Sequence, residues 1–216
     1  MAWAEQIRAA GMGPTLATVL GAYVLGCFAT GYLLVRARTG RDIRDFESGS
    51  TGARNVGRLL GKTGFFLTLA GDFGKGALAV WASVRFTENP ALVILALLAV
   101  VAGHIWPAPL HFHGGKGVAT SLGALLVFDW RLAVAYAVCF VIGLAVVRKT
   151  TVPGLAAFLS LPFTSWWLNR DAATATALCI LAAMVLFAHR RNIIEEFPAL
   201  DERRDATAKS HPPSHE

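Results

Sequence analysis

Residues 103–123 read GHIWPAPLHFHGGKGVATSLG, a polar and glycine-rich insert between two apolar runs. Three glycines, Gly114, Gly115 and Gly117, surround a single cation, Lys116. Glycines let backbone N–H groups approach an anion, a following helix N-terminus adds partial positive charge, and a lysine adds a full one. The pattern predicts a phosphate-binding loop at a membrane surface, although a glycine-rich turn with one lysine explains GGKG alone equally well. The GxxxxGK(S/T) spacing of a P-loop is absent.

The composition around this insert is that of a membrane protein. With 216 residues, 55% of them hydrophobic, 16% charged and a mean hydropathy of +0.51, the chain is too apolar for a soluble domain of this length. The net charge of +6 does not indicate a nucleic-acid partner, because the basic residues alternate with apolar runs. The three cysteines each lie inside an apolar run, so no disulfide framework is expected. No metal spacing appears around the histidines His104, His111 and His113.

Seven apolar runs predict an all-α polytopic membrane protein with about seven transmembrane helices. The fourth run is short for a full span. At ~1.5 Å per residue it covers about 18 Å of a ~30 Å hydrocarbon core, so it is expected to be a half-helix or to continue beyond Asp129 and Trp130 into the interface. The runs are residues 14–35, 63–84, 90–106, 117–128, 132–147, 152–168 and 173–188.

Positive charges predict the orientation of these helices. Fifteen lysines and arginines fall in the odd-numbered connections and after the last run, against four on the opposite side, with Lys75 inside a span. The positive-inside rule therefore places the N-terminus outside and the C-terminus in the cytoplasm. Residues 195–216 contain paired prolines and no apolar period, so they are expected to form a disordered cytoplasmic tail after a membrane domain of residues 1–194. The polar connections on the cytoplasmic side are then able to share one site.

The first connection, residues 42–64, combines hydroxyls, glycines and cations. If a helix starts near Ser50, Arg54 and Arg58 lie four apart on one face, where both guanidinium groups are able to grip a phosphate. A loop that only sets the topology would explain the arginines but not the neighbouring glycines or Asn55. The connection is therefore expected to bind phosphate together with the insert.

Two further pairs of polar residues lie within or beside apolar runs. Asp72 and Lys75 are three apart, and a charge at such depth costs roughly 2.5–3.5 kcal/mol unless it is paired or faces water. A structural ion pair and a substrate-facing lysine explain them equally well. At the end of the last run, His189 and Asn192 lie three apart on one helical face, either as a helix cap or as site residues.

Three segments together resemble the signature motifs of the bacterial acyl-phosphate:glycerol-3-phosphate acyltransferase family, PlsY. They are SGSTGARNVGR at residues 48–58, GHIWPAPLHFHGGKGVAT at 103–120 and HRRNI at 189–193. The second segment is the most specific of the three. The resemblance implies a seven-span acyltransferase domain in the bacterial inner membrane, with its motifs on the cytoplasmic side.

The resemblance further implies a reaction, its partners and its site residues. An acyl chain would pass from acyl phosphate to the sn-1 hydroxyl of glycerol 3-phosphate, giving lysophosphatidic acid and phosphate without a cofactor, as the first step of phospholipid synthesis. Functional coupling to the enzyme that makes acyl phosphate is implied as well. The motif match implies four catalytic residues, Ser48, Lys116, His189 and Asn192. The expected substrate-binding residues are Arg54, Asn55, Arg58, Lys75, His104, Gly114, Gly115, Gly117 and Thr151.

The chain also departs from the family pattern. Glu47 and Ser50 replace a glycine and an asparagine in the first motif, and Glu195-Glu196 replaces a basic-apolar pair beside the third. Negative charge near the site opposes an anionic substrate, so a family paralogue with a different acceptor is one alternative. A carrier of phosphate-like anions is another, because it too would use glycine-rich half-helices and arginines. That carrier predicts internal repeats, and none is visible in the sequence.

Overall fold

The structure is a computed structural model that describes residues 3–194, and it confirms the all-α fold. The expected tail, with Glu195 and Glu196, lies outside the described residues. No strand occurs between residues 3 and 194. The α-helices are α1 (Trp3–Ala10), α2 (Met12–Cys27), α3 (Thr30–Thr39), α4 (Ala53–Phe86), α5 (Pro90–Ile105), α6 (Val118–Phe128), α7 (Trp130–Val147), α8 (Thr151–Asn169) and α9 (Ala172–Ala188). Two short 3-10 helices are η1 (Ile43–Asp45) and η2 (Ala108–Leu110).

The apolar runs of the sequence correspond to these helices. The first run covers α2 and α3, which are separated at Phe28 and Ala29, and the later runs correspond in order to α4 through α9. Three helical segments within residues 3–194 are long and apolar enough to cross a membrane by themselves, Met12–Thr39, Pro90–Leu110 and Trp130–Val147. The shorter apolar helices are α6 and α9.

The fourth run forms a short helix that does not continue past Asp129. Helix α6 has 11 residues and ends at Phe128, because the backbone of Asp129 is extended. The Asp129 side chain accepts a hydrogen bond from the N–H of Arg131 at 3.0 Å and thereby caps the start of α7. Of the two alternatives for this run, the structure shows the short helix.

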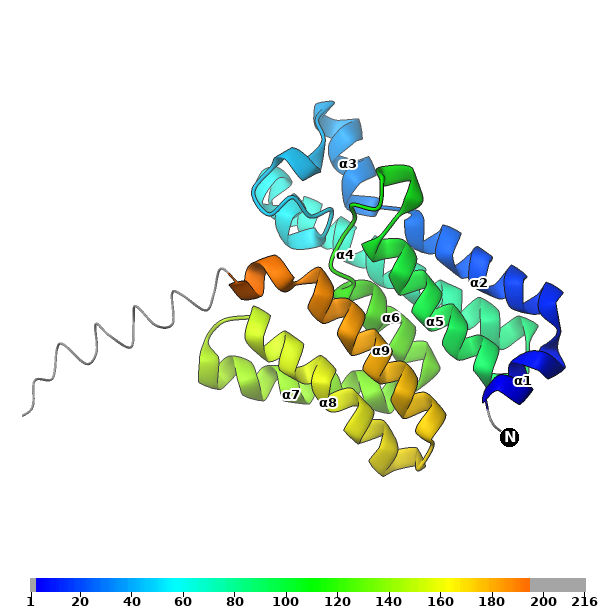
Figure 1. Cartoon of the computed structure of the whole chain (residues 1–216). Helices are drawn as coiled ribbons and strands as arrows, with labels where there is room; N and C mark the ends of the chain where they lie inside the picture. The colour runs from blue at the N-terminus through cyan, green and yellow to red at the C-terminus, as the bar shows by residue number, and fades with distance from the viewer. Residues whose placement is uncertain (1–2, 195–216) are drawn as a thin grey trace, which may run out of the picture.

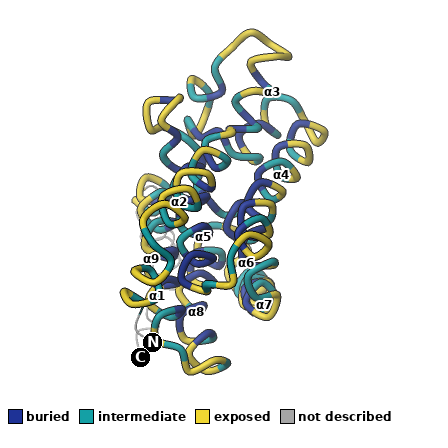
Figure 2. Tube along the Cα trace, turned by 90° about the vertical axis from the view of Figure 1, so that its right-hand side faces the viewer, coloured by how far each residue is buried: buried dark blue, intermediate teal, exposed yellow. Residues whose placement is uncertain are grey.

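Close helix crossings fix α6 in place. Helix α5 is the most central element, with twelve of its sixteen residues buried, as the dark blue tube in Figure 2 shows. Helix α4 crosses α6 so closely that a Cβ on Gly76 would lie 2.0 Å from the Thr120 carbonyl oxygen, and a Cβ on Gly123 would lie 2.0 Å from that of Phe73. Small residues permit such backbone approach between helices in a bilayer. The polar loop that precedes α6 is therefore held against α4 and α5.

The polar segments gather at one end of the bundle (Figure 1). Helix α3, the start of α4, the loop before α6, the α7–α8 connection and the end of α9 lie at that end. Helix α1 and the α4–α5 and α8–α9 connections lie at the other end. This arrangement follows from the alternating direction of successive helices, and it brings together the connections that sequence analysis grouped.

Candidate active site

The GGKG loop is folded back onto the end of α5. Gly114 and Gly115 donate their N–H groups to the carbonyl oxygens of the last two residues of α5, at 3.1 and 3.0 Å. Gly117 is the N-cap of α6 and has a left-handed backbone with φ 84°, which glycine adopts without strain. Lys116 is thus placed between the end of one helix and the start of the next.

Two of these glycines are needed for space. A Cβ on Gly114 would lie 2.2 Å from the carbonyl oxygen of His104, and a Cβ on Gly115 would lie 2.0 Å from Nε2 of the same residue. The sequence suggested that backbone N–H groups here approach an anion. The structure corrects this for Gly114 and Gly115, because their N–H groups are already bonded to α5. Lys116 is the group in the loop that supplies a full positive charge.

The first connection docks beside the GGKG loop. The N–H of Thr51 donates to the carbonyl oxygen of Gly114 at 3.4 Å, and Nη1 of Arg44 donates to that of Leu110 at 2.8 Å. Ser48 is exposed on this connection. Two loops that are about sixty residues apart in the sequence therefore form one surface.

Asn55 lies inside the first connection. Its side chain is buried, and Nδ2 lies 3.1, 3.0 and 2.9 Å from the carbonyl oxygens of Ile43, Phe46 and Ser50. A buried amide that serves several loop carbonyls fixes the shape of the loop. This environment favours a supporting position for Asn55 over direct contact with substrate.

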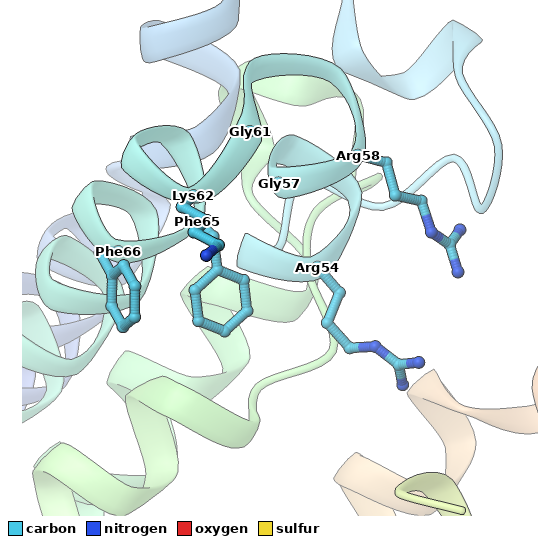
Figure 3. Close-up of a pocket in the computed structure, with 7 residues that line it drawn as sticks. All are labelled: Arg54, Gly57, Arg58, Gly61, Lys62, Phe65 and Phe66. Atoms are coloured by element: carbon cyan, nitrogen blue, oxygen red, sulfur yellow. The ribbon is translucent and has the colours of Figure 1, made fainter.

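Arg54 and Arg58 point to the same side of the first turns of α4, in agreement with their spacing (Figure 3). The helix begins at Ala53, slightly later than the expected start near Ser50. The two arginines contact different groups. Nη1 of Arg54 donates to the Thr150 hydroxyl at 2.9 Å, and Nη1 of Arg58 lies 3.3 Å from a carboxylate oxygen of Glu47.

A pocket of about 560 Å³ lies at a kink in α4. The kink is at Gly61, where φ is 70° and ψ is −164°, and it turns the first part of the helix back so that Gly57 packs on Phe65. Figure 3 shows the two arginines on one side of the kink and the two phenyl rings on the other. The pocket therefore combines cations with an apolar wall. Its lining residues are Arg54, Gly57, Arg58, Gly61, Lys62, Phe65 and Phe66.

The end of α9 contributes an amide and an imidazole. Nζ of Lys116 donates to Oδ1 of Asn192. Nδ1 of His189 lies 2.8 Å from the carbonyl oxygen of Val185, and because a carbonyl only accepts, Nδ1 carries the proton and Nε2 is the acceptor in a neutral ring. Burial lowers the pKa of His189, and the positive charges of Lys116 and Arg54 lower it as well. The ring is therefore neutral near pH 7.

Four segments that are far apart in the sequence thus meet at one polar end. They carry Arg54, Lys116, His189 and Asn192, together with a hydroxyl from the connection before α8. That hydroxyl belongs to Thr150. The next residue, Thr151, which the family resemblance assigns to substrate binding, starts α8, and its contact with substrate stays a prediction.

Two residues expected to bind substrate lie in the interior. The side chains of Lys75 and His104 are only 3% and 4% exposed. Nζ of Lys75 lies 3.1 Å from Asp72 and donates to the carbonyl oxygen of Phe28 at 2.7 Å. The structural ion pair is therefore the alternative that the structure supports. Nδ1 of His104 lies 3.6 Å from Asp72, a carboxylate partner that spacing along the sequence did not reveal. Across residues 3–194, no three His, Cys, Asp or Glu side chains are grouped to hold a metal ion.

Comparison with known proteins identifies the family of this chain. Residues 16–197 match the family model described as glycerol-3-phosphate acyltransferase. The chain is 48% identical to glycerol-3-phosphate acyltransferase 1 of Desulfitobacterium hafniense (strain Y51) over 86% of its own length and 92% of the relative. It is 35% identical to glycerol-3-phosphate acyltransferase 1 of Bacillus cereus, over 80% of this chain and 94% of that relative.

A solved structure has the same fold. It is the crystal structure of PlsY (YgiH), an integral membrane glycerol 3-phosphate acyltransferase, in its glycerol 3-phosphate form. The two chains superpose with a TM-score of 0.79 at 28% identity, over 87% of this chain and 94% of the other. The lysophosphatidic acid form of that protein gives a TM-score of 0.76. The chain therefore belongs to the glycerol-3-phosphate acyltransferase (PlsY) family and is a multi-pass membrane acyltransferase.

Proposed function

We propose that this enzyme transfers an acyl group from acyl phosphate to the sn-1 hydroxyl of glycerol 3-phosphate and releases lysophosphatidic acid and inorganic phosphate. The observation that carries the proposal is the meeting of Arg54, Lys116, His189 and Asn192 from three separate segments, with Thr150 from a fourth. Both substrates of this reaction carry phosphate, and a site with several cations around a neutral imidazole suits them.

The pocket at the α4 kink supports an amphiphilic donor. Arg54 and Arg58 supply positive charge on one side of the kink, and Lys62 lies on the other side beside the apolar rings of Phe65 and Phe66. An acyl phosphate has the matching parts, a charged phosphate on an apolar chain. Because the donor is a reactive mixed anhydride, we also propose functional coupling to the enzyme that makes it.

The proposed reaction needs no covalent enzyme intermediate. An acyl phosphate is already activated, and the chain contains neither a GxSxG elbow nor an HxxxxD box. The glycerol hydroxyl oxygen attacks the acyl carbonyl carbon, the bond from that carbon to the phosphate oxygen breaks, and phosphate leaves with the electron pair. The hydroxyl proton passes to the departing phosphate.

Positioning and charge stabilisation account for catalysis in this scheme. Holding the two substrates in register contributes about 7–11 kcal/mol to lowering the barrier, and each donor aimed at the developing oxyanion contributes about 2.7–4 kcal/mol. Lys116 and Arg58 are proposed to hold phosphate groups, with Ser48 and the hydroxyls before α8 as further donors. Nε2 of His189 is available to order the glycerol hydroxyl, because Nδ1 is bonded to Val185.

We further propose that the chain crosses the bacterial inner membrane seven times, with the site in the cytoplasm. The excess of basic residues at the polar end supports this orientation. Water-soluble glycerol 3-phosphate would then arrive from the cytoplasm and the acyl donor from the bilayer. A reporter fused at the C-terminus should score as cytoplasmic, and one inserted at residues 87–89 should score as external. Opposite signals would place the site on the external face, away from cytoplasmic glycerol 3-phosphate, and would contradict the proposed orientation.

A reconstituted assay tests the reaction. Purified enzyme receives acyl phosphate with glycerol 3-phosphate, and phosphate release and acylated product are followed against a sample without acceptor. Acyl-CoA and acylated carrier protein serve as alternative donors, and product analysis locates the acyl group. Stoichiometric 1-acyl-glycerol 3-phosphate and phosphate are expected with acyl phosphate alone. Activity that requires a thioester donor, or product acylated at sn-2, would contradict the proposal.

A further inference from the structure

Three ionisable side chains form a buried cluster beneath the polar end of the bundle. Asp72 and Lys75 lie on α4 with their charged groups 3.1 Å apart, and Nδ1 of His104 on α5 lies 3.6 Å from the same Asp72 oxygen. All three side chains are at most 4% exposed. Burying charged groups is costly, and an apolar replacement of similar volume is often as stable. Their presence therefore calls for a role in addition to stability.

Lys75 connects this cluster to the break between α2 and α3. The break leaves Phe28 with ψ 95°, outside the helical region, so its carbonyl oxygen lacks the usual helical partner. Nζ of Lys75 donates to that oxygen at 2.7 Å. A backbone acceptor within a bilayer-embedded bundle must be satisfied by the protein, and Lys75 does so here. One end of the cluster is thus anchored to the first apolar segment.

His104 connects the other end of the cluster to the GGKG loop. Its carbonyl oxygen accepts the N–H of Gly115 at 3.0 Å. Its ring fills the space where a side chain at position 115 would stand, because a Cβ there would lie 2.0, 2.6 and 3.1 Å from Nε2, Cε1 and Cδ2. The imidazole therefore packs directly against Gly115, the residue that immediately precedes Lys116.

We propose that Asp72, Lys75 and His104 are positioning residues that hold the GGKG loop and thereby aim Lys116. Lys75 fixes the position of the Asp72 carboxylate, and that carboxylate orients the His104 ring through Nδ1. The ring in turn fixes the position of the Gly115 backbone. The positioning of the loop follows from these contacts alone, and its kinetic consequence rests on the proposed function. His104 thus acts on catalysis through Lys116 and does not contact substrate.

A double-mutant cycle between His104 and Gly115 tests the contact. Gly115→Ala introduces a Cβ that collides with the ring, and a misplacement of about 1 Å costs on the order of a hundredfold in kcat/KM. In the His104→Ala background the ring is gone, so adding Gly115→Ala should cost less than about threefold. Equal costs in the two backgrounds would overturn the assignment.

Gly114 provides the matched control. A Cβ at Gly114 would meet the main-chain oxygen of His104, which remains after His104→Ala. Gly114→Ala should therefore be equally harmful in both backgrounds. If His104→Ala also reduced the loss of kcat/KM caused by Gly114→Ala, the cycle would report a general loosening of the loop, and the proposal would fail.

Amide hydrogen exchange gives a readout that does not depend on activity. In the full-length protein in detergent, a peptide covering residues 107–117 should exchange at least tenfold faster in His104→Ala and in Asp72→Asn than in the unmodified protein. Peptides from α7 should be unchanged, because they lie outside the cluster. Unchanged loop exchange in both variants would contradict the proposal even if activity fell.

The two measurements separate this inference from the proposed reaction. If the unmodified protein transfers no acyl group from acyl phosphate, the proposed function fails, and the exchange experiment still decides whether the cluster holds the loop. If transfer occurs, Asp72→Asn should lower kcat and raise the KM for the phosphate substrates, in addition to the loss of unfolding temperature expected when one partner of a buried ion pair is removed. A lower unfolding temperature with unchanged kinetics would show a purely structural pair.

Discussion

The molecule pairs opposite charges in two regions that differ mainly in exposure. At the surface, Arg58 lies 3.3 Å from Glu47, with side chains 50% and 63% exposed. In the interior, Lys75 lies 3.1 Å from Asp72, with both side chains 3% exposed. Similar distances therefore have different consequences. An exposed pair contributes about 0–1 kcal/mol and exchanges readily with other ions, whereas breaking a buried pair leaves an unpaired charge.

This difference in exposure distinguishes a side chain that is able to bind substrate from one that stabilises the framework of the protein. A guanidinium at the surface is able to leave Glu47 for a phosphate at little cost. An ammonium held by Asp72 and the Phe28 carbonyl cannot leave without exposing both to an apolar environment. The exposed region is therefore the place to look for substrate contacts, and the buried region is the place to look for the framework.

The largest expected effect comes from breaking the interior pair on one side. Lys75→Met leaves the Asp72 carboxylate buried without its ion-pair partner and should destabilise the protein by about 3–5 kcal/mol, measured by thermal unfolding in detergent. The surface counterpart Arg58→Met should cost less than about 1 kcal/mol. The double variant Asp72→Asn/Lys75→Met should recover most of the loss. An equally unstable double variant would contradict the ion-pair explanation.

Removing the loop cation should affect turnover more than stability. Lys116→Ala is expected to lower kcat at least on the order of a hundredfold, since it removes a donor that stabilises charge in the reaction. Lys116→Arg should fail as well, because a planar guanidinium does not replace a point charge between glycines. Unfolding temperature and yield serve as controls. Normal turnover in Lys116→Ala would show that Lys116 is not part of the active site.

The exposed pair can be opened by changing Glu47. Glu47→Gln removes the charge that competes for Arg58 and should lower the KM for glycerol 3-phosphate about threefold, with a difference that shrinks at high salt because exposed charges are screened within ~8–10 Å. Glu47 has φ 43°, a left-handed conformation that costs a non-glycine residue about 1–2 kcal/mol. Glu47→Gly should therefore also raise the unfolding temperature, whereas Glu47→Gln should not. An unchanged KM in both variants would mean that the carboxylate does not compete with substrate.

The smallest effect concerns His189. Its side chain is buried, like those of the interior pair, but the charges of Lys116 and Arg54 act on it. Burial and the charges of Lys116 and Arg54 lower its pKa in the folded protein below the usual value near 6.5. On acidification the unfolded chain therefore binds the proton first, so this group makes the folded state less stable as the pH falls below about 6.5. His189→Gln should flatten the decrease in unfolding temperature between pH 7 and 5. An identical pH profile for both proteins would contradict this account.

Sequence alone determined the fold class and the grouping of the polar segments. Hydropathy is a local property, so the apolar runs located the helices, and the alternation of connections predicted which loops would meet. The spacing of Arg54 and Arg58 also predicted their common side, because i and i+4 side chains are neighbours on any helix. These features depend on short stretches of chain, and each can be inferred without knowing what packs against it.

Only the tertiary structure decided which polar groups are accessible. The sequence predicts substrate contacts for Asn55 and His104 and leaves Lys75 open between an ion pair and a substrate contact, yet the tertiary structure buries all three. Thr150, and not Thr151, contacts Arg54, because the start of α8 sets which hydroxyl faces α4. Asp72 and His104 meet although they are 32 positions apart. Such contacts depend on how closely the helices approach one another, and glycines at the crossings allow a backbone distance that no local pattern specifies.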